Sequence, residues 1–486
     1  MLILSLPYRG AHILETSGET LDPQDWQVFR RQSHRMLDDM LDYTEYLRNR
    51  PVWQPIPQEV RDLFQKPMPI KSGDMAEIHA MFMQNVLPYA IGNAHPGFMG
   101  WVHGGGTPVG MMAEMLSAGL NANLGGRDQI PVEVERQMLR WVREIFAFPD
   151  TASGLFVTGT SMANFISVLV ARTAALGTAV RETGLYLEHG LVAYASASAH
   201  VSIAQALDMA GLGTSALRKV ALDENFRMDV NALEAAIRRD LEAGLRPFMI
   251  AATAGSVDVG AIDPIDEIAE LAKRYQLWLH VDGAYGALGM LSEEIRPMLK
   301  GMERADSIAF DFHKWGQVPY DAGFVLVKDG ELHRSTFASP AAYLQRETRG
   351  MAAGSPWPCD FGPDLSRSFR ALKTWFTLEV YGTEKLGRSI SNTCALAQYL
   401  KQCIEASPML ELMAPVALNI VCFRYRGDDK INADIVVGLQ ESGIAAPSTT
   451  KINGRLAIRA AIVNHRTERR DVDALVNAVI ELGGKL

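Results

Sequence analysis

The stretch Asp311-Phe-His-Lys-Trp315 directly follows a short apolar run, Asp306-Ser-Ile-Ala-Phe310, which is bounded by charged residues. Such a run predicts a buried strand, so Lys314 is expected at the end of a sheet. Burial disfavours the charged form of a lysine, and a neutral amine can attack a carbonyl group to form a Schiff base. The stretch by itself fits equally well with a lysine at the rim of the sheet whose amine reaches water.

Strands and helices alternate on both sides of this stretch. Apolar runs predict seven strands, at residues 154–158, 191–195, 218–222, 247–253, 277–282, 305–310 and 323–327. Helical periodicity fills most of the intervals, as at residues 162–176 and 264–275. This repeated β-α-β order predicts an α/β fold with an open, mostly parallel sheet that carries helices on both faces. Ligands of such sheets bind at the carboxyl ends of the strands.

The chain of 486 residues is too long for a single hydrophobic core, so several domains are expected. Residues 1–94 are predicted to form an N-terminal helical arm, residues 95–375 a large α/β domain, and residues 376–486 a small C-terminal α+β domain. The arm has apolar helix faces but too few residues for a core of its own. We therefore expect it to pack on another body, such as a second subunit.

Composition excludes several classes of function. The formal net charge of -9 argues against a nucleic-acid partner, because phosphate neutralisation needs clustered basic residues. No run approaches the ~18 apolar residues of a membrane span, and the apolar start lacks the basic segment of a signal peptide. The spacing of the four cysteines fits neither a zinc site nor a disulfide framework, so we expect a reducing, cytoplasmic setting and no metal site. These cysteines are Cys359, Cys394, Cys403 and Cys422.

Residues 158–164 follow one predicted strand and open a helix. Their small side chains leave backbone N–H groups free at the helix N-terminus, where an anion can bind, and the hydroxyls of Thr160 and Ser161 can add donors. The same residues nearly match a nucleophile elbow, which would make Ser161 the nucleophile of a hydrolase. A plain N-capped helix is the structural alternative.

Two further polar side chains lie at predicted strand ends. Asp282, in His280-Val-Asp-Gly-Ala-Tyr285, could orient a histidine, bind a metal, hold a protonated ring nitrogen or simply stabilise a turn. His200 could act as a base, stack on a flat ring or have a structural role. An anion site, a flat-ring neighbour, a carboxylate and Lys314 at one sheet edge together suit pyridoxal phosphate, which is a phosphorylated, cationic and planar aldehyde.

The segments 280–285 and 311–315 resemble the signature of the group II pyridoxal-phosphate-dependent amino-acid decarboxylases. Residues 49–57, 95–98, 191–200 and 369–382 are similar to other parts of that family. The resemblance implies a fold-type I enzyme with a central, mostly parallel seven-stranded sheet. It also implies an obligate homodimer with active sites at the subunit interface, and decarboxylation of an aromatic or related L-amino acid to the amine and CO2.

The resemblance also implies residue roles. Lys314 would form the Schiff base, Asp282 would pair with the pyridine nitrogen, and Ala284 and His200 would lie on the two faces of the ring. The other candidate cofactor contacts are Thr160, Ser161, Thr253, Ser256 and His313, and the candidate substrate contacts are Trp101, His103, Tyr343 and Arg459.

Two departures from the family pattern bear on the reaction. Residues 354–361 contain no tyrosine where many relatives have one that returns a proton, and Phe312 replaces a common proline. Oxidative deamination to an aldehyde, or an aldol-type carbon–carbon cleavage, therefore remains open beside simple decarboxylation. The glycine triplet at 104–106 can let the backbone approach another group closely, and it predicts a roomier, more polar pocket. Outside this class, a Ser161 hydrolase or a catalytically silent α/β protein would leave Lys314 unexplained.

Overall fold

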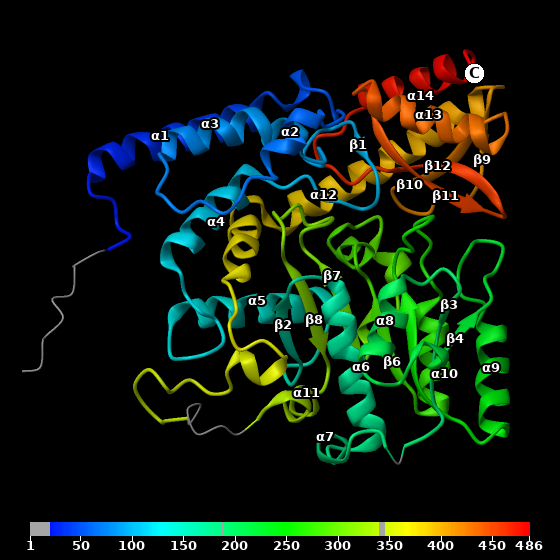
Figure 1. The fold of residues 1–486 in the computed structure, drawn as a ribbon. Helices are drawn as coiled ribbons and strands as arrows, with labels where there is room; N and C mark the ends of the chain where they lie inside the picture. Colours follow the sequence, from blue (N-terminus) through cyan, green and yellow to red (C-terminus); the bar gives the residue numbers. More distant parts are fainter. Residues whose placement is uncertain (1–19, 187, 340–345) are drawn as a thin grey trace, which may run out of the picture.

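The computed structural model describes residues 20–186, 188–339 and 346–486 (Figure 1). Its main sheet has seven strands in the order β2-β8-β7-β6-β5-β3-β4. Strand β8 runs antiparallel to both β2 and β7, and the other neighbouring strands are parallel. The strand bounds are β2 Ser153–Val157, β3 Leu191–Ser196, β4 Leu217–Val220, β5 Arg246–Thr253, β6 Trp278–Asp282, β7 Ser307–Asp311 and β8 Gly323–Val327. The sequence-based prediction of a mostly parallel seven-stranded sheet is confirmed.

Helices cover both faces of this sheet, because successive side chains of a buried strand point to opposite faces. Ile250 of β5 packs in a cluster with residues of α9 and α10, whereas its neighbour Met249 packs with residues of α6 and α8. The helices of this domain are α4 Pro108–Leu120, α5 Ile130–Phe146, α6 Thr160–Leu176, α7 Val180–Thr183, α8 Val201–Met209, α9 Val230–Glu242, α10 Ile265–Tyr275 and α11 Gly330–Phe337.

A second sheet, of five strands in the order β1-β11-β12-β10-β9, forms the C-terminal domain with two helices. The bounds are β1 Phe98–Met99, β9 Leu410–Leu412, β10 Ile420–Tyr425, β11 Ala446–Ile452, β12 Arg455–Ala461, α13 Asp429–Glu441 and α14 Arg469–Gly483. Strand β1 joins this sheet from a segment that the sequence assigned to the large domain. The long helix α12 (Arg370–Ala406) connects the two sheets, so the predicted boundary at residue 375 falls inside one element, which Gly382 interrupts with a φ of 72°.

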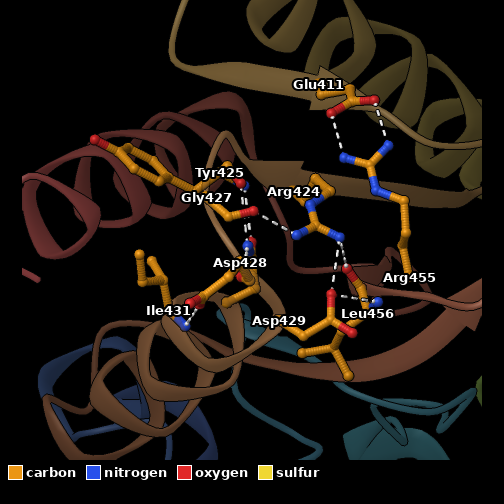
Figure 2. A network of polar contacts seen from close by, with 10 residues as sticks. Glu411, Arg424, Tyr425, Gly427, Asp428, Asp429, Ile431, Arg455 and Leu456 are labelled. Atoms are coloured by element: carbon orange, nitrogen blue, oxygen red, sulfur yellow. Dashed lines mark hydrogen bonds and ion pairs between the residues drawn. The ribbon is translucent and has the colours of Figure 1, made fainter.

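Arg424 of β10 joins three elements of the C-terminal domain (Figure 2). Its guanidinium donates to Asp429 Oδ1 at 3.0 Å, at the start of α13, and to the carbonyl oxygen of Leu456 at 3.0 Å, in β12. It also donates to the carbonyl oxygen of Gly427 at 2.6 Å. Because the Arg424 side chain is only 2% exposed, water does not replace these partners.

The N-terminal arm projects from the body of the molecule (Figure 1). It consists of α1 (Trp26–Glu45), α2 (Gln58–Leu63) and α3 (Met75–Asn85), and α1 packs beside α3. No residue of α1 is buried. Among the described residues, no helix combines the length and the apolar character that crossing a membrane requires.

Candidate functional site

A cavity of about 390 Å³ lies where β5, β6 and β7 end and α6 begins. Ten of the predicted site residues line it: Trp101, His103, Thr160, Ser161, His200, Thr253, Asp282, Ala284, His313 and Lys314. Residues from distant parts of the sequence therefore meet at the carboxyl edge of the sheet, as the strand order requires.

Lys314 stands just beyond β7, and its amine forms an ion pair with Asp311. The Lys314 Nζ lies 2.9 Å from Asp311 Oδ2, and the Asp311 side chain is almost fully buried. The other carboxylate oxygen of Asp311 accepts a hydrogen bond from the backbone N–H of Thr160 at 2.7 Å. Asp311 thus connects the lysine to the first residue of α6.

The start of α6 has the features of an anion site. Its N-cap is Gly159, which offers no side-chain acceptor to the first turn. The Thr160 hydroxyl is buried and has no hydrogen-bond partner among the described residues. Gly323 lies against Gly159, since a Cβ at Gly323 would sit 2.4 Å from the Gly159 Cα. A buried hydroxyl without a partner, at a helix N-terminus that faces a cavity, fits the phosphate of pyridoxal phosphate.

Asp282 ends β6 with its carboxylate at the cavity. Its Oδ2 accepts from Asn164 Nδ2 at 3.0 Å, and its Oδ1 accepts from the backbone N–H of Ala284 at 3.1 Å. Burial raises the pKa of Asp282, while the hydrogen bond from Asn164 and the charge of Lys314 act in the opposite direction. A buried carboxylate of this kind is the partner that a protonated ring nitrogen needs.

His200 caps the start of α8 from the wall of the cavity. Its Nδ1 accepts from the backbone N–H of Ser202 at 3.2 Å and lies 2.8 Å from the Ser202 hydroxyl. These contacts hold the imidazole ring in one orientation.

Aromatic rings form another wall. The ring of His103 stacks on Phe98 and Trp101, with centroids 5.8 Å apart in both pairs, and Tyr320 meets it edge-on at 5.9 Å. Burial and then the charge of Lys314 lower the pKa of His103, which favours a neutral ring. This wall would contact a flat substrate better than a charged one.

The close approach expected of the glycine triplet occurs at Gly104. A Cβ at this position would lie 2.3 Å from the carbonyl oxygen of His313 and 2.5 Å from that of Lys314. The ring of His313 is fixed by the backbone N–H of Ala322, which donates to its Nδ1 at 3.0 Å, and burial lowers the pKa of His313 to about 4.

Three predicted residues are placed differently. Arg459 lies behind the cavity wall, where its guanidinium donates to the carbonyl oxygens of Trp101 and Asp258, both at 3.2 Å. Ser256 accepts from the backbone N–H of Ala261 and does not line the cavity. Tyr343 falls outside the described residues.

The hydrolase and metal alternatives gain no support from the described part of the chain. No hydrogen bond there joins Ser161 to a histidine. Nor does any group of three or more His, Cys, Asp or Glu side chains within those residues have the arrangement of a metal site.

Sequence reasoning missed Asp311 and Asn164 as site residues. A signal existed for Asp311, an acidic residue three positions before a candidate catalytic lysine. Asn164 closes the segment 158–164 that was predicted to bind an anion, but its side chain points toward Asp282 instead. Tyr320 lines the cavity from the loop after Lys314.

Known proteins share both the sequence pattern and the fold. Residues 57–426 match the model of a family described as the pyridoxal-dependent decarboxylase conserved domain. The aromatic-L-amino-acid decarboxylase of Bacillus atrophaeus is 31% identical over 462 residues, which cover 92% of this chain and 93% of that protein. The L-2,4-diaminobutyrate decarboxylase of Rhizobium meliloti (strain 1021) is 31% identical over 476 residues, which cover 96% and 94% of the two chains. The crystal structure of Oryza sativa TDC with PLP and tryptamine has the same fold, with a TM-score of 0.87 at 23% identity over 96% of this chain and 99% of that chain.

Proposed function

The chain belongs to the pyridoxal-dependent decarboxylase family, and from this membership we propose that it converts an aromatic or related L-amino acid to its amine and CO2. As a family member it is a pyridoxal-phosphate-dependent carboxy-lyase that acts on an amino acid. The observation that carries the assignment is the convergence of Lys314, Asp282 and the start of α6 on one cavity.

Pyridoxal phosphate, when bound, supplies an aldehyde that condenses with amines and a ring that accepts the electron pair released by a departing carboxylate. The Lys314 amine would hold the aldehyde carbon. Asp282 would keep a proton on the ring nitrogen, and His200 would cover one face of the ring. Thr160 and Ser161 would hold the phosphate at the start of α6.

The aromatic wall supports an aromatic substrate. Trp101, His103 and Tyr320 line the cavity beside Lys314, and their rings would exclude water from a flat side chain. An apolar, water-poor site favours the loss of a charged carboxylate. The two relatives at 31% identity act, by their names, on different amino acids. The proposal of an aromatic substrate therefore rests on the aromatic wall of the cavity.

Tyr320 supports the amine as the product. Tyr320 lines the cavity beside Lys314, and its phenol, which is protonated at neutral pH, would supply a proton to the substrate carbon after CO2 leaves. The absence of a tyrosine from residues 354–361 favours the second candidate, oxidative release of an aldehyde.

Product analysis on a panel of aromatic, acidic and basic L-amino acids separates these outcomes. We expect amine and CO2 in equal amounts, with the highest kcat/KM for an aromatic substrate. Aldehyde together with peroxide would establish the oxidative reaction, and cleavage of a β-hydroxy amino acid without CO2 would establish a carbon–carbon lyase. A purified chain that shows no absorbance band near ~410–430 nm after pyridoxal phosphate is added would overturn the cofactor assignment.

A homodimer with active sites at the subunit interface is part of the proposal. The exposed apolar side chains of the arm, such as Trp26 (58% exposed), Val28 and Ile78, leave a surface that a second copy would cover. We expect the chain to sediment as a dimer, and the double variant Val28→Glu, Ile78→Glu to sediment as a monomer with little turnover. A fully active monomer would contradict this proposal.

A cytoplasmic location is likewise proposed, because all four cysteines are free thiols, as a reducing compartment keeps them. Cell fractionation of the native protein tests it, with recovery from a membrane or secreted fraction as the contrary result.

A further inference from the structure

A chain of buried polar groups lies behind the cofactor-facing carboxylate of Asp282. Trp278 Nε1 donates to Ser307 Oγ at 2.8 Å, and Ser307 Oγ lies 2.9 Å from His280 Nδ1. His280 Nε2 lies 2.9 Å from Asn164 Oδ1. These contacts join β6, β7 and α6 beneath the floor of the cavity.

Asn164 is the branch point of this chain. Its Nδ2 lies 3.0 Å from Asp282 Oδ2 and 3.0 Å from Ser202 Oγ. Ser202 in turn contacts His200, which lines the cavity. One amide group therefore reaches both the residue expected at the ring nitrogen and the residue expected on the ring face.

The direction of each hydrogen bond follows from the chemistry of the two ends. An indole N–H only donates, and a carboxylate only accepts, so Asn164 must present its NH2 group to Asp282 and its oxygen to His280. Burial lowers the pKa of His280 to about 3, so this ring is neutral and carries a single N–H. That hydrogen lies on Nε2, and Nδ1 accepts from the Ser307 hydroxyl.

The branch toward His200 has a fixed direction as well. The backbone N–H of Ser202 donates to His200 Nδ1, so this nitrogen is an acceptor, and the Ser202 hydroxyl donates to it too. The Ser202 oxygen then accepts the second N–H of Asn164. The donors point one way, from the Trp278 indole to His200.

We propose that Asn164 is a positioning residue for the cofactor, which fixes the charge and orientation of the Asp282 carboxylate and the ring orientation of His200. The proposal rests on the cofactor being held as described under the proposed function. The titratable groups that face Asp282 are Lys314 and His200, and the charge of Lys314 favours the ionised form of Asp282. The hydrogen bond from Asn164 acts in the same direction.

The variant Asn164→Leu keeps the size of the side chain and removes all three hydrogen bonds. We expect the affinity for pyridoxal phosphate, measured by absorbance titration without substrate, to fall about tenfold or more. In the chain loaded with cofactor, the pH midpoint of the long-wavelength absorbance band should rise by about one unit or more. Without Asn164, the Asp282 carboxylate would no longer hold the proton on the ring nitrogen. A neutral ring nitrogen does not repel the proton on the linkage to Lys314, so that proton is lost at a higher pH. Ser167→Ala is the matched control: it is equally buried in α6, and its hydroxyl has no partner among the described residues.

If Asn164→Leu does not fold, Ser202→Ala still tests the proposed role of the hydrogen bonds that reach His200. This variant cuts only the branch to His200, so we expect weaker cofactor binding with an unchanged pH midpoint. Variants that bind the cofactor as tightly as Ser167→Ala, with the same midpoint, would overturn the proposal even if their melting temperatures fall. Failure of the proposed function is distinguishable, because the unmodified chain would then take up no cofactor.

Discussion

At the scale of single residues, Asp311 is the least expected member of the site. Its carboxylate accepts a hydrogen bond from the backbone N–H of Thr160 and forms an ion pair with the Lys314 amine. The phosphate of the cofactor would use the same N–H, and the aldehyde would use the same amine. The free chain therefore holds its own anion where the cofactor's anion is expected.

Asp311→Asn should consequently bind pyridoxal phosphate more tightly. The amide keeps the shape and an acceptor for Thr160 but removes a negative charge beside the expected phosphate, which we expect to raise the affinity about tenfold. Absorbance or calorimetric titration measures it, with Asp306→Asn, outside the cavity, as the control. Weaker binding by Asp311→Asn would show that the carboxylate assists the cofactor.

At the scale of the elements, the C-terminal domain depends on the contacts of Arg424. We expect Arg424→Ala to lower the free energy of unfolding by about 3 kcal/mol, because it removes a side chain that is only 2% exposed together with its hydrogen bonds to Asp429, Gly427 and Leu456. Urea denaturation measures this change. Arg455→Ala is the control: this arginine forms an exposed pair with Glu411, and its loss should cost about 1 kcal/mol or less. Equal losses in both variants would contradict the role given to Arg424.

The elements also show where sequence reasoning succeeds. Strands β6 and β7 were predictable because their apolar runs are buried on both faces, and each run delivers Asp282 or Lys314 to the same edge of the sheet. Strand β11 was missed, because Ser448 and its threonine neighbours leave it no apolar run, and its place depends on pairing with β1 and β12. Helix α13 was missed as well.

Some residues of the candidate site could be predicted from the sequence and others could not. Lys314 and Asp282 could be found from their positions at strand ends, since position along one strand is a local property. The roles of Asn164 and Asp311 depend on which side chains meet across α6, β6 and β7, and no local pattern encodes those contacts.

At the scale of the whole molecule, histidines whose pKa is lowered by burial make stability depend on pH. Burial lowers the pKa of His280 and His333 to about 3, and that of His313 and His465 to about 4, from an ordinary value of 6.5. Below pH 6.5 each of these histidines binds more protons in the unfolded chain than in the folded chain, so its contribution to the free energy of unfolding falls as the pH drops toward 4. The buried carboxyl of Asp263, whose pKa burial raises to about 6, acts in the opposite direction. Each histidine contributes a loss of up to about 1.4 kcal/mol per pH unit in this window.

Denaturation at a series of pH values between neutrality and pH ~5 measures this slope. His333 lies outside the cavity, and the variant His333→Asn should reduce the dependence of the free energy of unfolding on pH by about the contribution of one histidine. A slope that does not change in this variant would contradict the assignment of neutral buried rings.

The central claim, that this molecule holds pyridoxal phosphate on Lys314, is tested most directly by reduction and peptide mapping. The chain is loaded with the cofactor, reduced with borohydride, digested and analysed by mass spectrometry. We expect a single modified residue, Lys314, and no modification in Lys314→Ala, whereas Lys328→Ala should be modified like the unmodified chain. A reduced cofactor on a different lysine, or decarboxylation by a chain that carries none, would contradict the account.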